Sequence, residues 1–70
     1  MEKFGEKLRV LRKRQGLTTR ALGELLGVSH AYISQMERGK DTPNIAMAIK
    51  LADIFGVTVD QLVRDDQVLE

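Results

Sequence analysis

Hydrophobic residues recur along this chain at the three- and four-residue spacing of a helix, and no segment alternates in the manner of a β-strand. The apolar positions with this spacing are Phe4, Leu8, Leu11, Leu22, Leu25, Leu26, Ile33, Met36, Ile45, Ala48, Ile49 and Ala52. The segment from Val57 to Val59 is β-branched, but its helix-start signal outweighs its strand propensity. The pattern therefore predicts an all-α fold.

Helix boundaries follow from a short pattern that occurs three times: GLTTRAL at 16–22, GVSHAYI at 27–33 and GVTVDQL at 56–62. In each copy, glycine ends one helix in the left-handed conformation, and the next Ser or Thr caps a new helix between two stapling aliphatic residues. Gly39 provides another stop, and Asn44, after the only proline, provides another N-cap. These signals predict five helices, at about 2–14, 19–26, 30–38, 45–55 and 59–64.

The composition limits the classes of protein to which this chain can belong. Seventy residues make one domain, which we expect to span 1–70 with its core at about 4–64. The absence of cysteine excludes a disulfide framework and a thiolate metal site. One histidine, and acids concentrated in the terminal DDQVLE, give no catalytic or metal-binding cluster, so we expect no enzyme, metal or cofactor. No apolar run approaches the length of a membrane span and MEKFGEK lacks the apolar core of a secretory signal, so the expected location is cytoplasmic.

The net charge of +1 is unevenly distributed along the chain. Residues 1–20 hold seven Lys or Arg against two Glu, whereas residues 53–70 hold five acids against one Arg. A protein that offers one end to a polyanion has this distribution, and a solvated surface with ordinary helix-end charge preferences has it too.

One side of the predicted helix at 30–38 has few apolar residues to bury. At about 100° per residue, Ile33 and Met36 fall on the side that faces the core. The opposite side contains no acid, and it carries His30, Ala31, Ser34, Gln35 and Arg38. Hydrogen-bonding groups, one small apolar group and a cation suit contacts with base edges and phosphates in the major groove of DNA.

Only Gly27, Val28 and Ser29 separate this segment from the helix before it, which is the tight turn of a helix-turn-helix unit. Gly23 lies inside that preceding helix, where it costs about 1 kcal/mol relative to Ala. We expect Gly23 to allow a close approach of the backbone of the second helix.

The motifs RKRQGLT, LLGVSHAYISQMERGK and PNIAMAIKLADIFGVTVDQL, in this order, resemble the helix-turn-helix domain of the phage repressor and Cro family. The resemblance runs from Leu8 to Leu62. It implies a compact five-helix, lambda-repressor-like domain whose second and third helices form the helix-turn-helix. It also implies sequence-specific binding to double-stranded DNA and transcriptional regulation, as a homodimer on an inverted-repeat operator. No small-molecule ligand is evident.

The resemblance also implies roles for single residues. The family often holds a phosphate through Gln at the position of Thr19, and reads bases from the outer face of the third helix. Gln35 can pair with adenine, and Ala31 can touch a thymine methyl group. The implied DNA-binding residues are Thr19, Arg20, Ser29, His30, Ala31, Tyr32, Ser34, Gln35, Arg38 and Lys40.

For several of these side chains, a structural role remains an alternative to DNA contact. His30 contacts a base or phosphate, or is an ordinary exposed residue at a helix start; Tyr32 borders the core and is as well explained by packing. Lys13 and Arg14 are phosphate candidates, or favourable cations at a helix C-terminus. The family further implies a structural ion pair between Arg12 and Glu37, with Arg12 serving the fold.

Two larger alternatives remain open. The aliphatic residues Val59, Val63, Val68 and Leu69 suit a dimer interface, or the packing of a short last helix and its tail. The domain is alternatively a protein-interaction module on the same fold, because fold alone does not fix function. In that case the outer face of 30–38 would tolerate charge reversal at Gln35 and Arg38.

Overall fold

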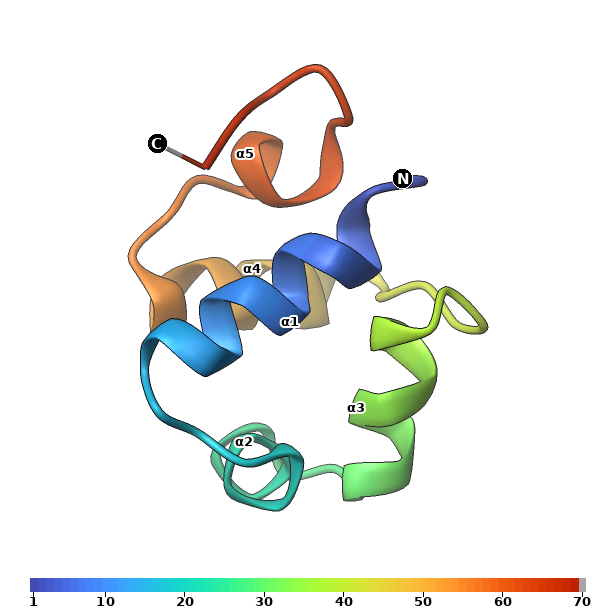
Figure 1. Cartoon of the computed structure of the whole chain (residues 1–70), viewed down its shortest axis with the longest axis vertical. Helices are drawn as coiled ribbons and strands as arrows, with labels where there is room; N and C mark the ends of the chain where they lie inside the picture. The colour runs from blue at the N-terminus through green and yellow to red at the C-terminus, as the bar shows by residue number, and fades with distance from the viewer. Residues whose placement is uncertain (70) are drawn as a thin grey trace.

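The computed structural model describes residues 1–69, and this part of the chain forms five α-helices and no strand (Figure 1). The helices are α1 (Phe4–Arg14), α2 (Thr19–Leu26), α3 (His30–Glu37), α4 (Ile45–Phe55) and α5 (Val59–Val63). The all-α prediction is confirmed. Three boundaries differ slightly: α1 begins at Phe4 rather than at residue 2, and Arg38 and Arg64 are the C-cap residues of α3 and α5.

The predicted N-caps form the predicted hydrogen bonds. Each cap side chain accepts from the backbone N–H three residues later, at 2.8 to 3.2 Å, and the caps are Thr18, Ser29, Asn44 and Thr58. In the last case the Thr58 N–H also donates to Gln61 Oε1 at 3.0 Å, which completes a capping box. Such a cap stabilises a helix by about 1 kcal/mol. Helices as short as α3 and α5 therefore start at fixed residues.

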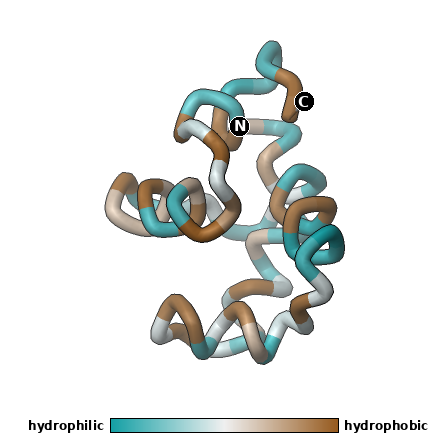
Figure 2. The backbone as a smooth tube through the Cα atoms, turned by 90° about the vertical axis from the view of Figure 1, so that its left-hand side faces the viewer, coloured by the Kyte–Doolittle hydropathy of each residue, from teal (hydrophilic) through white to brown (hydrophobic). Residues whose placement is uncertain are grey.

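All five helices contribute to one hydrophobic core. Its buried members are Phe4, Leu8, Leu11, Leu22, Leu26, Ile33, Met36, Leu51, Phe55 and Leu62. In Figure 1, α1 crosses in front of α4, and α3 rises beside α2, which is seen end-on. Apolar and polar stretches alternate along the helices in Figure 2, so each helix turns one side to the core and another to water.

Three of the aliphatic residues that have helical spacing are exposed. Leu25 on α2 is 61% exposed, and Ile45 and Ile49 on α4 are 70% and 47% exposed. The spacing identifies residues that share a side of a helix, but it does not say how far the neighbouring helices cover that side. Here α4 buries Ala48, Leu51, Ala52 and Phe55 and leaves both isoleucines outside.

Lys7, one of the seven cations counted in residues 1–20, is buried. Only 8% of the residue is exposed, and its Nζ donates to the carbonyl oxygens of Gln61 at 2.7 Å, Arg64 at 2.6 Å and Gln67 at 2.7 Å. The last carbonyls of a helix have no partner within the helix. The ammonium group of Lys7, on α1, provides that partner. It thereby holds α5 and the chain after it against α1.

A second contact joins the two ends of the chain in the opposite sense. The carboxylate of Asp65 accepts from the backbone N–H groups of Lys3 at 2.8 Å and Glu2 at 3.0 Å, just before α1 begins. These hydrogen bonds lower the pKa of the Asp65 carboxyl below its usual value. The start of α1 and the whole of α5 accordingly lie at the same end of the molecule (Figure 1).

We expect Lys7→Met to lower the free energy of unfolding by about 2 kcal/mol, because the carbonyl oxygens lose a charged donor while the aliphatic volume is kept. Urea denaturation at neutral pH measures the change. Arg9→Met, at an exposed position of α1, is the matched control. Equal stability of the two variants would contradict the role assigned to Lys7.

Asp65 gives the stability a defined dependence on pH. Its pKa is lower in the folded chain than in the unfolded chain, so the ionised carboxylate stabilises the fold above the unfolded pKa of about 3.9. This contribution is lost as the pH falls through the folded pKa. We expect Asp65→Asn to flatten the loss of stability in acid, measured by urea unfolding at a series of pH values. Asp53→Asn, at an exposed position of α4, is the control, and a wild-type slope in Asp65→Asn would refute the assignment.

Candidate nucleic-acid interface

A tight turn joins α2 to α3. Gly27 ends α2 with φ 74°, in the left-handed region, and the N–H of Val28 then donates to the Gly23 carbonyl at 2.9 Å. Ser29 follows at once as the N-cap of α3. Only three residues therefore separate the two helices, which confirms the predicted helix-turn-helix.

Gly23 allows this turn to lie directly against α2. A Cβ atom at this position would be 2.7 Å from the Val28 carbonyl oxygen and 3.3 Å from the His30 nitrogen. The expected close approach is therefore confirmed, and its tightest contact is with the turn just before α3. A larger residue would push the start of α3 away from α2.

The other end of α3 is fixed by an ion pair with α1. Arg12 donates from Nε to Glu37 Oε2 at 2.6 Å and from Nη2 to Oε1 at 3.1 Å, and its Nη1 donates to the Leu17 carbonyl at 2.9 Å. The two charged side chains are only 13% and 9% exposed. The hydrogen bonds to Glu37 raise the pKa of Arg12. The pairing implied by the family resemblance is thus present, and Arg12 serves the fold.

Gly5 has a similar role that the sequence did not reveal. A Cβ atom on Gly5 would lie 2.5 Å from the Glu37 carbonyl oxygen and 2.8 Å from that of Met36. The first turn of α1 therefore touches the end of α3 through backbone atoms. A glycine inside a predicted helix was the available signal, the same one that identified Gly23.

The outer side of α3 is open, as the pattern predicted. Ile33 and Met36 are completely buried on the inner side, whereas Gln35 is exposed on the outer side. The other predicted residues that are exposed are Arg20, Ser29, His30, Ala31, Arg38 and Lys40. Those that are half-buried are Thr19, Tyr32 and Ser34. All ten belong to α2, the turn, α3 or the loop that follows it.

Two of these residues have structural duties. The Ser29 hydroxyl oxygen accepts from the Tyr32 N–H at 3.2 Å and caps α3. The Tyr32 side chain packs against the hydrophobic core, which favours the packing interpretation given to it above.

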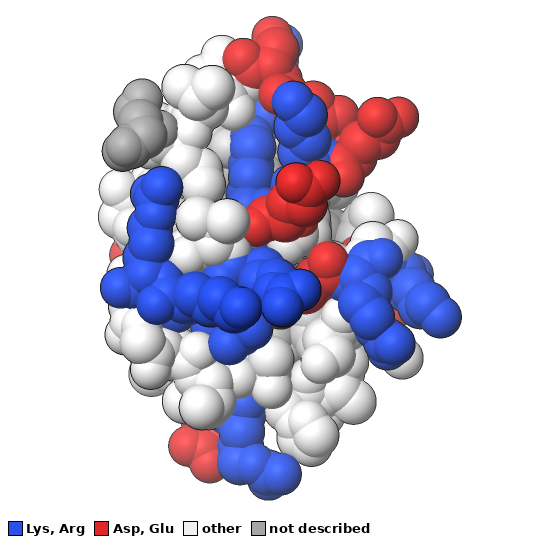
Figure 3. All heavy atoms as spheres, viewed as in Figure 1, with Lys and Arg blue, Asp and Glu red and all other residues white. Residues whose placement is uncertain are grey.

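Charge is segregated on the surface. In Figure 3, basic side chains form a band across the middle of the molecule, where α1 lies, and a separate group beside the end of α3. Acidic side chains gather at the end that holds α5 and the N-terminus. The exposed cations of α1 include Arg9, Lys13 and Arg14, and the candidate interface contributes Arg20, Arg38 and Lys40. The cations of the interface are therefore few and lie around a largely uncharged α3.

Within residues 1–69, no group of three potential ligands is placed to hold a metal ion. No helix among the described residues has the length and apolarity to cross a membrane.

Comparison with known proteins gives a consistent result. The helix-turn-helix family model matches residues 8–62, the span over which the motifs carried the resemblance. The HTH-type transcriptional activator BcrR of Enterococcus faecalis is 38% identical over 66 residues, which cover 94% of this chain and 32% of BcrR. This chain therefore spans about a third of the length of that relative.

Solved structures agree with the sequence relatives. The P22 c2 repressor protein in complex with a synthetic operator superimposes with a TM-score of 0.84 at 35% identity, covering 90% of this chain and 96% of the repressor chain. The restriction-modification controller protein C.AhdI of Aeromonas hydrophila gives a TM-score of 0.76 at 33% identity, covering 86% and 87%.

Because the Arg12–Glu37 pair is largely buried, we expect Glu37→Met to destabilise the fold by about 3 to 5 kcal/mol, mainly by leaving the Arg12 charge uncompensated. The double variant Arg12→Met/Glu37→Met removes both charges and is expected to lose less stability than the sum of the single variants. Urea denaturation of the four proteins gives the coupling energy. Strictly additive losses would show that the two side chains do not act as a pair.

Proposed function

This chain belongs to the helix-turn-helix family, and on that premise we propose that it binds double-stranded DNA in a sequence-specific manner and regulates transcription. The relatives named above are regulators of transcription or of restriction-modification, and one of them is seen with a synthetic operator. The family relation supports a regulator and not an enzyme.

The observation that carries the proposal is the orientation of α3. Its inner side is buried and anchored at both ends, by the Gly23 contact and by the Arg12–Glu37 pair. Its outer side presents Gln35 to solvent. A helix held in this way can enter the major groove, about 12 Å wide, without rearrangement of the core.

We assign two kinds of contact to the ten predicted residues. Base edges are read by Gln35, which suits adenine, by Ala31, which suits a thymine methyl group, and by His30 and Ser34. Phosphates are held by the remaining polar and basic side chains of the unit: Thr19, Arg20, Ser29, Arg38, Lys40 and the hydroxyl group of Tyr32, whose ring packs on the core. Thr19 has a shorter reach than the Gln common at its position in the family, so we assign it one hydrogen bond at most.

One copy alone has a short reading surface. The eight residues of α3 extend about 12 Å, which covers only a few base pairs. We therefore propose that two copies bind an inverted repeat, with half-sites about 34 Å apart. The cytoplasm is the proposed compartment.

Selection of bound sequences from random duplexes, followed by titration at two salt concentrations, tests the proposal. We expect an inverted repeat to emerge from the selection. Binding that is equally weak on all duplexes and disappears with added salt would refute sequence-specific recognition.

Substitutions of Gln35 and Lys40 are expected to weaken DNA binding in different ways. Gln35→Ala should cost about 1 to 3 kcal/mol on the selected site and relax the preference at one base pair, because a base contact is lost. Lys40→Ala should weaken binding to all duplexes similarly and reduce the salt slope by about one, because a phosphate contact is lost.

Competition titrations with selected and random duplexes measure both effects. Arg9→Ala, which removes an exposed cation of α1 outside the interface, is the control for net charge. Equal losses of Gln35→Ala on selected and random DNA would remove this residue from the set that reads bases.

A further inference from the structure

Two backbone hydrogen bonds close the last turn of α3 and join it to the loop that follows. The N–H of Gly39 donates to the Met36 carbonyl at 3.2 Å, and the N–H of Lys40 donates to the Gln35 carbonyl at 2.9 Å. With Gly39 at φ 76°, these bonds form the Schellman motif that ends many helices. Gln35, assigned above to a base edge, and Lys40, assigned to a phosphate, therefore belong to one hydrogen-bonded turn.

The first turn of α1 lies directly against this turn, at Gly5. A Cβ atom on Gly5 would lie 2.8 Å from the Met36 carbonyl oxygen, which is the acceptor of the Gly39 hydrogen bond, and 2.5 Å from that of Glu37. Ordinary van der Waals contact begins at 3.4 Å, so a methyl group here must drive the two backbones apart by about 1 Å. Gly5 thus touches the part of α3 on which both DNA contacts depend.

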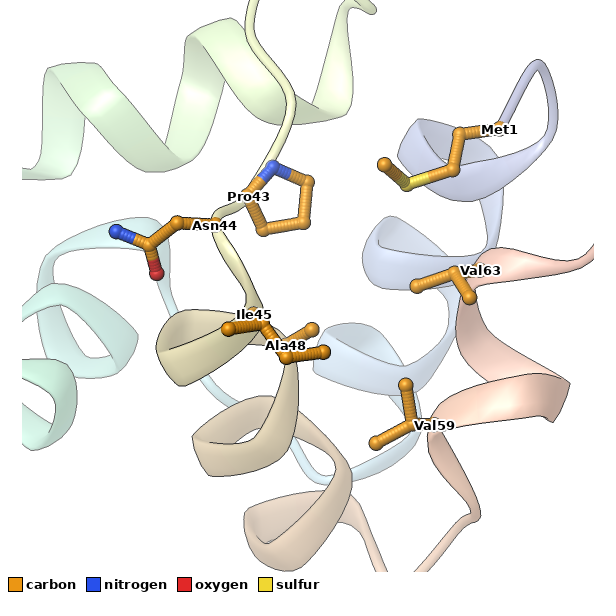
Figure 4. Close-up of a pocket in the computed structure, with 7 residues that line it drawn as sticks. All are labelled: Met1, Pro43, Asn44, Ile45, Ala48, Val59 and Val63. Atoms are coloured by element: carbon orange, nitrogen blue, oxygen red, sulfur yellow. The ribbon is translucent and has the colours of Figure 1, made fainter.

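The other side of α1 is held by α5 and the chain after it. Lys7 lies about 160° around α1 from Gly5, and its Nζ donates to two carbonyl oxygens at the end of α5 at 2.7 and 2.6 Å. The Asp65 carboxylate accepts from two N–H groups just before α1. The start of the chain also lies beside α5, where Met1 and Val63 line one side of an apolar hollow of about 190 Å³ (Figure 4). Moving α1 away from α3 would press Lys7 into its acceptors, so the end of α3 has to move instead.

A displaced end would tilt α3, because its start is held at the turn that packs on Gly23. The eight residues of α3 extend about 12 Å, so a displacement of about 1 Å at one end is a tilt of about 5°. Hydrogen bonds to base edges form only over about 2.7 to 3.2 Å, whereas attraction to a phosphate changes little over the same displacement. The tilt therefore costs the base contact of Gln35 and leaves His30, near the fixed start, in place.

We propose that Gly5 determines DNA-sequence specificity as a positioning residue, although it lies on α1 and outside the ten candidate contacts. The proposal rests on the function proposed above. Because it has no side chain, Gly5 lets the last turn of α3 lie at the distance from α1 at which Gln35 meets its base. Helix propensity alone favours Ala inside α1. The contact with α3, and not the helix, accounts for the glycine.

The test compares Gly5→Ala with the wild-type chain on a duplex that carries one selected half-site and on a random duplex. The ratio of the two affinities should fall about tenfold in Gly5→Ala, the size expected for one base contact. This ratio does not depend on the fraction of folded protein, because that fraction lowers both affinities equally. Sequences selected by Gly5→Ala should lose the preference at the base pair that Gln35→Ala identifies and keep the others.

Lys7→Met is the matched control, because it lowers stability from the other side of the same helix and adds no atom next to α3. It should keep the wild-type ratio. A wild-type ratio in Gly5→Ala, or an equal fall in Lys7→Met, would overturn the proposal. All affinities are measured with trimethylamine N-oxide, which favours the folded state. A Gly5→Ala chain that is unfolded under these conditions would also overturn the proposal, which requires a displaced α3 in a folded domain.

A measurement without DNA separates this proposal from the proposed function. In proton–nitrogen correlation spectra, Gly5→Ala should shift the backbone amide resonances of residues 36–40 more than those of residues 27–31 at the fixed start of α3. Shifts confined to the neighbours of Gly5 on α1 would refute the displacement of α3. If the displacement is observed but the wild type shows no preference for selected over random DNA, sequence-specific binding is refuted, and the role of Gly5 in specificity is refuted with it.

Discussion

The ion pair between Arg12 and Glu37 is the contact on which the position of α3 depends. It joins two side chains that are 25 residues apart in the chain, one on α1 and one on α3, and both are largely excluded from water. A buried pair of this kind adds little net stability compared with apolar residues, but breaking one side of it is costly. Its value here is geometric, because it allows one arrangement of α3 on α1. Gly5 and Gly23 complete that arrangement by bringing backbone atoms together at either end of α3.

Only the folded arrangement shows which of the charged side chains are exposed and which are used in the core. The sequence placed an excess of cations in the first 20 residues. Two of them, Lys7 and Arg12, are used inside the fold. Others, such as Arg9 and Lys13, lie exposed on α1. The candidate interface takes its cations from α2 and from the loop after α3. Charge counted along the chain therefore indicated a partner class, but not the surface that meets it.

Contacts between the two ends of the chain hold α5 against α1. Lys7 and Asp65 hold α1 and the segment after α5 together through hydrogen bonds in both directions. The same contacts set the position of α5. Because α1 also fixes α3 through Arg12, one helix positions both the candidate interface and α5.

What the sequence by itself determined is local. It comprises the caps at Thr18, Ser29, Asn44 and Thr58, the turn at Gly27, and the open side of α3 around Gln35. Each of these depends on residues within about four positions of one another, and over that distance helix geometry fixes which side chains come into contact. Tertiary structure decided the burial of Lys7, the role of Asp65, the contact at Gly5 and the exposure of Leu25, Ile45 and Ile49. The partners of Lys7 and Asp65 lie 54 to 63 residues away. A periodic pattern reports which side of a helix is apolar. Whether another helix covers that side is settled only when the chain has folded.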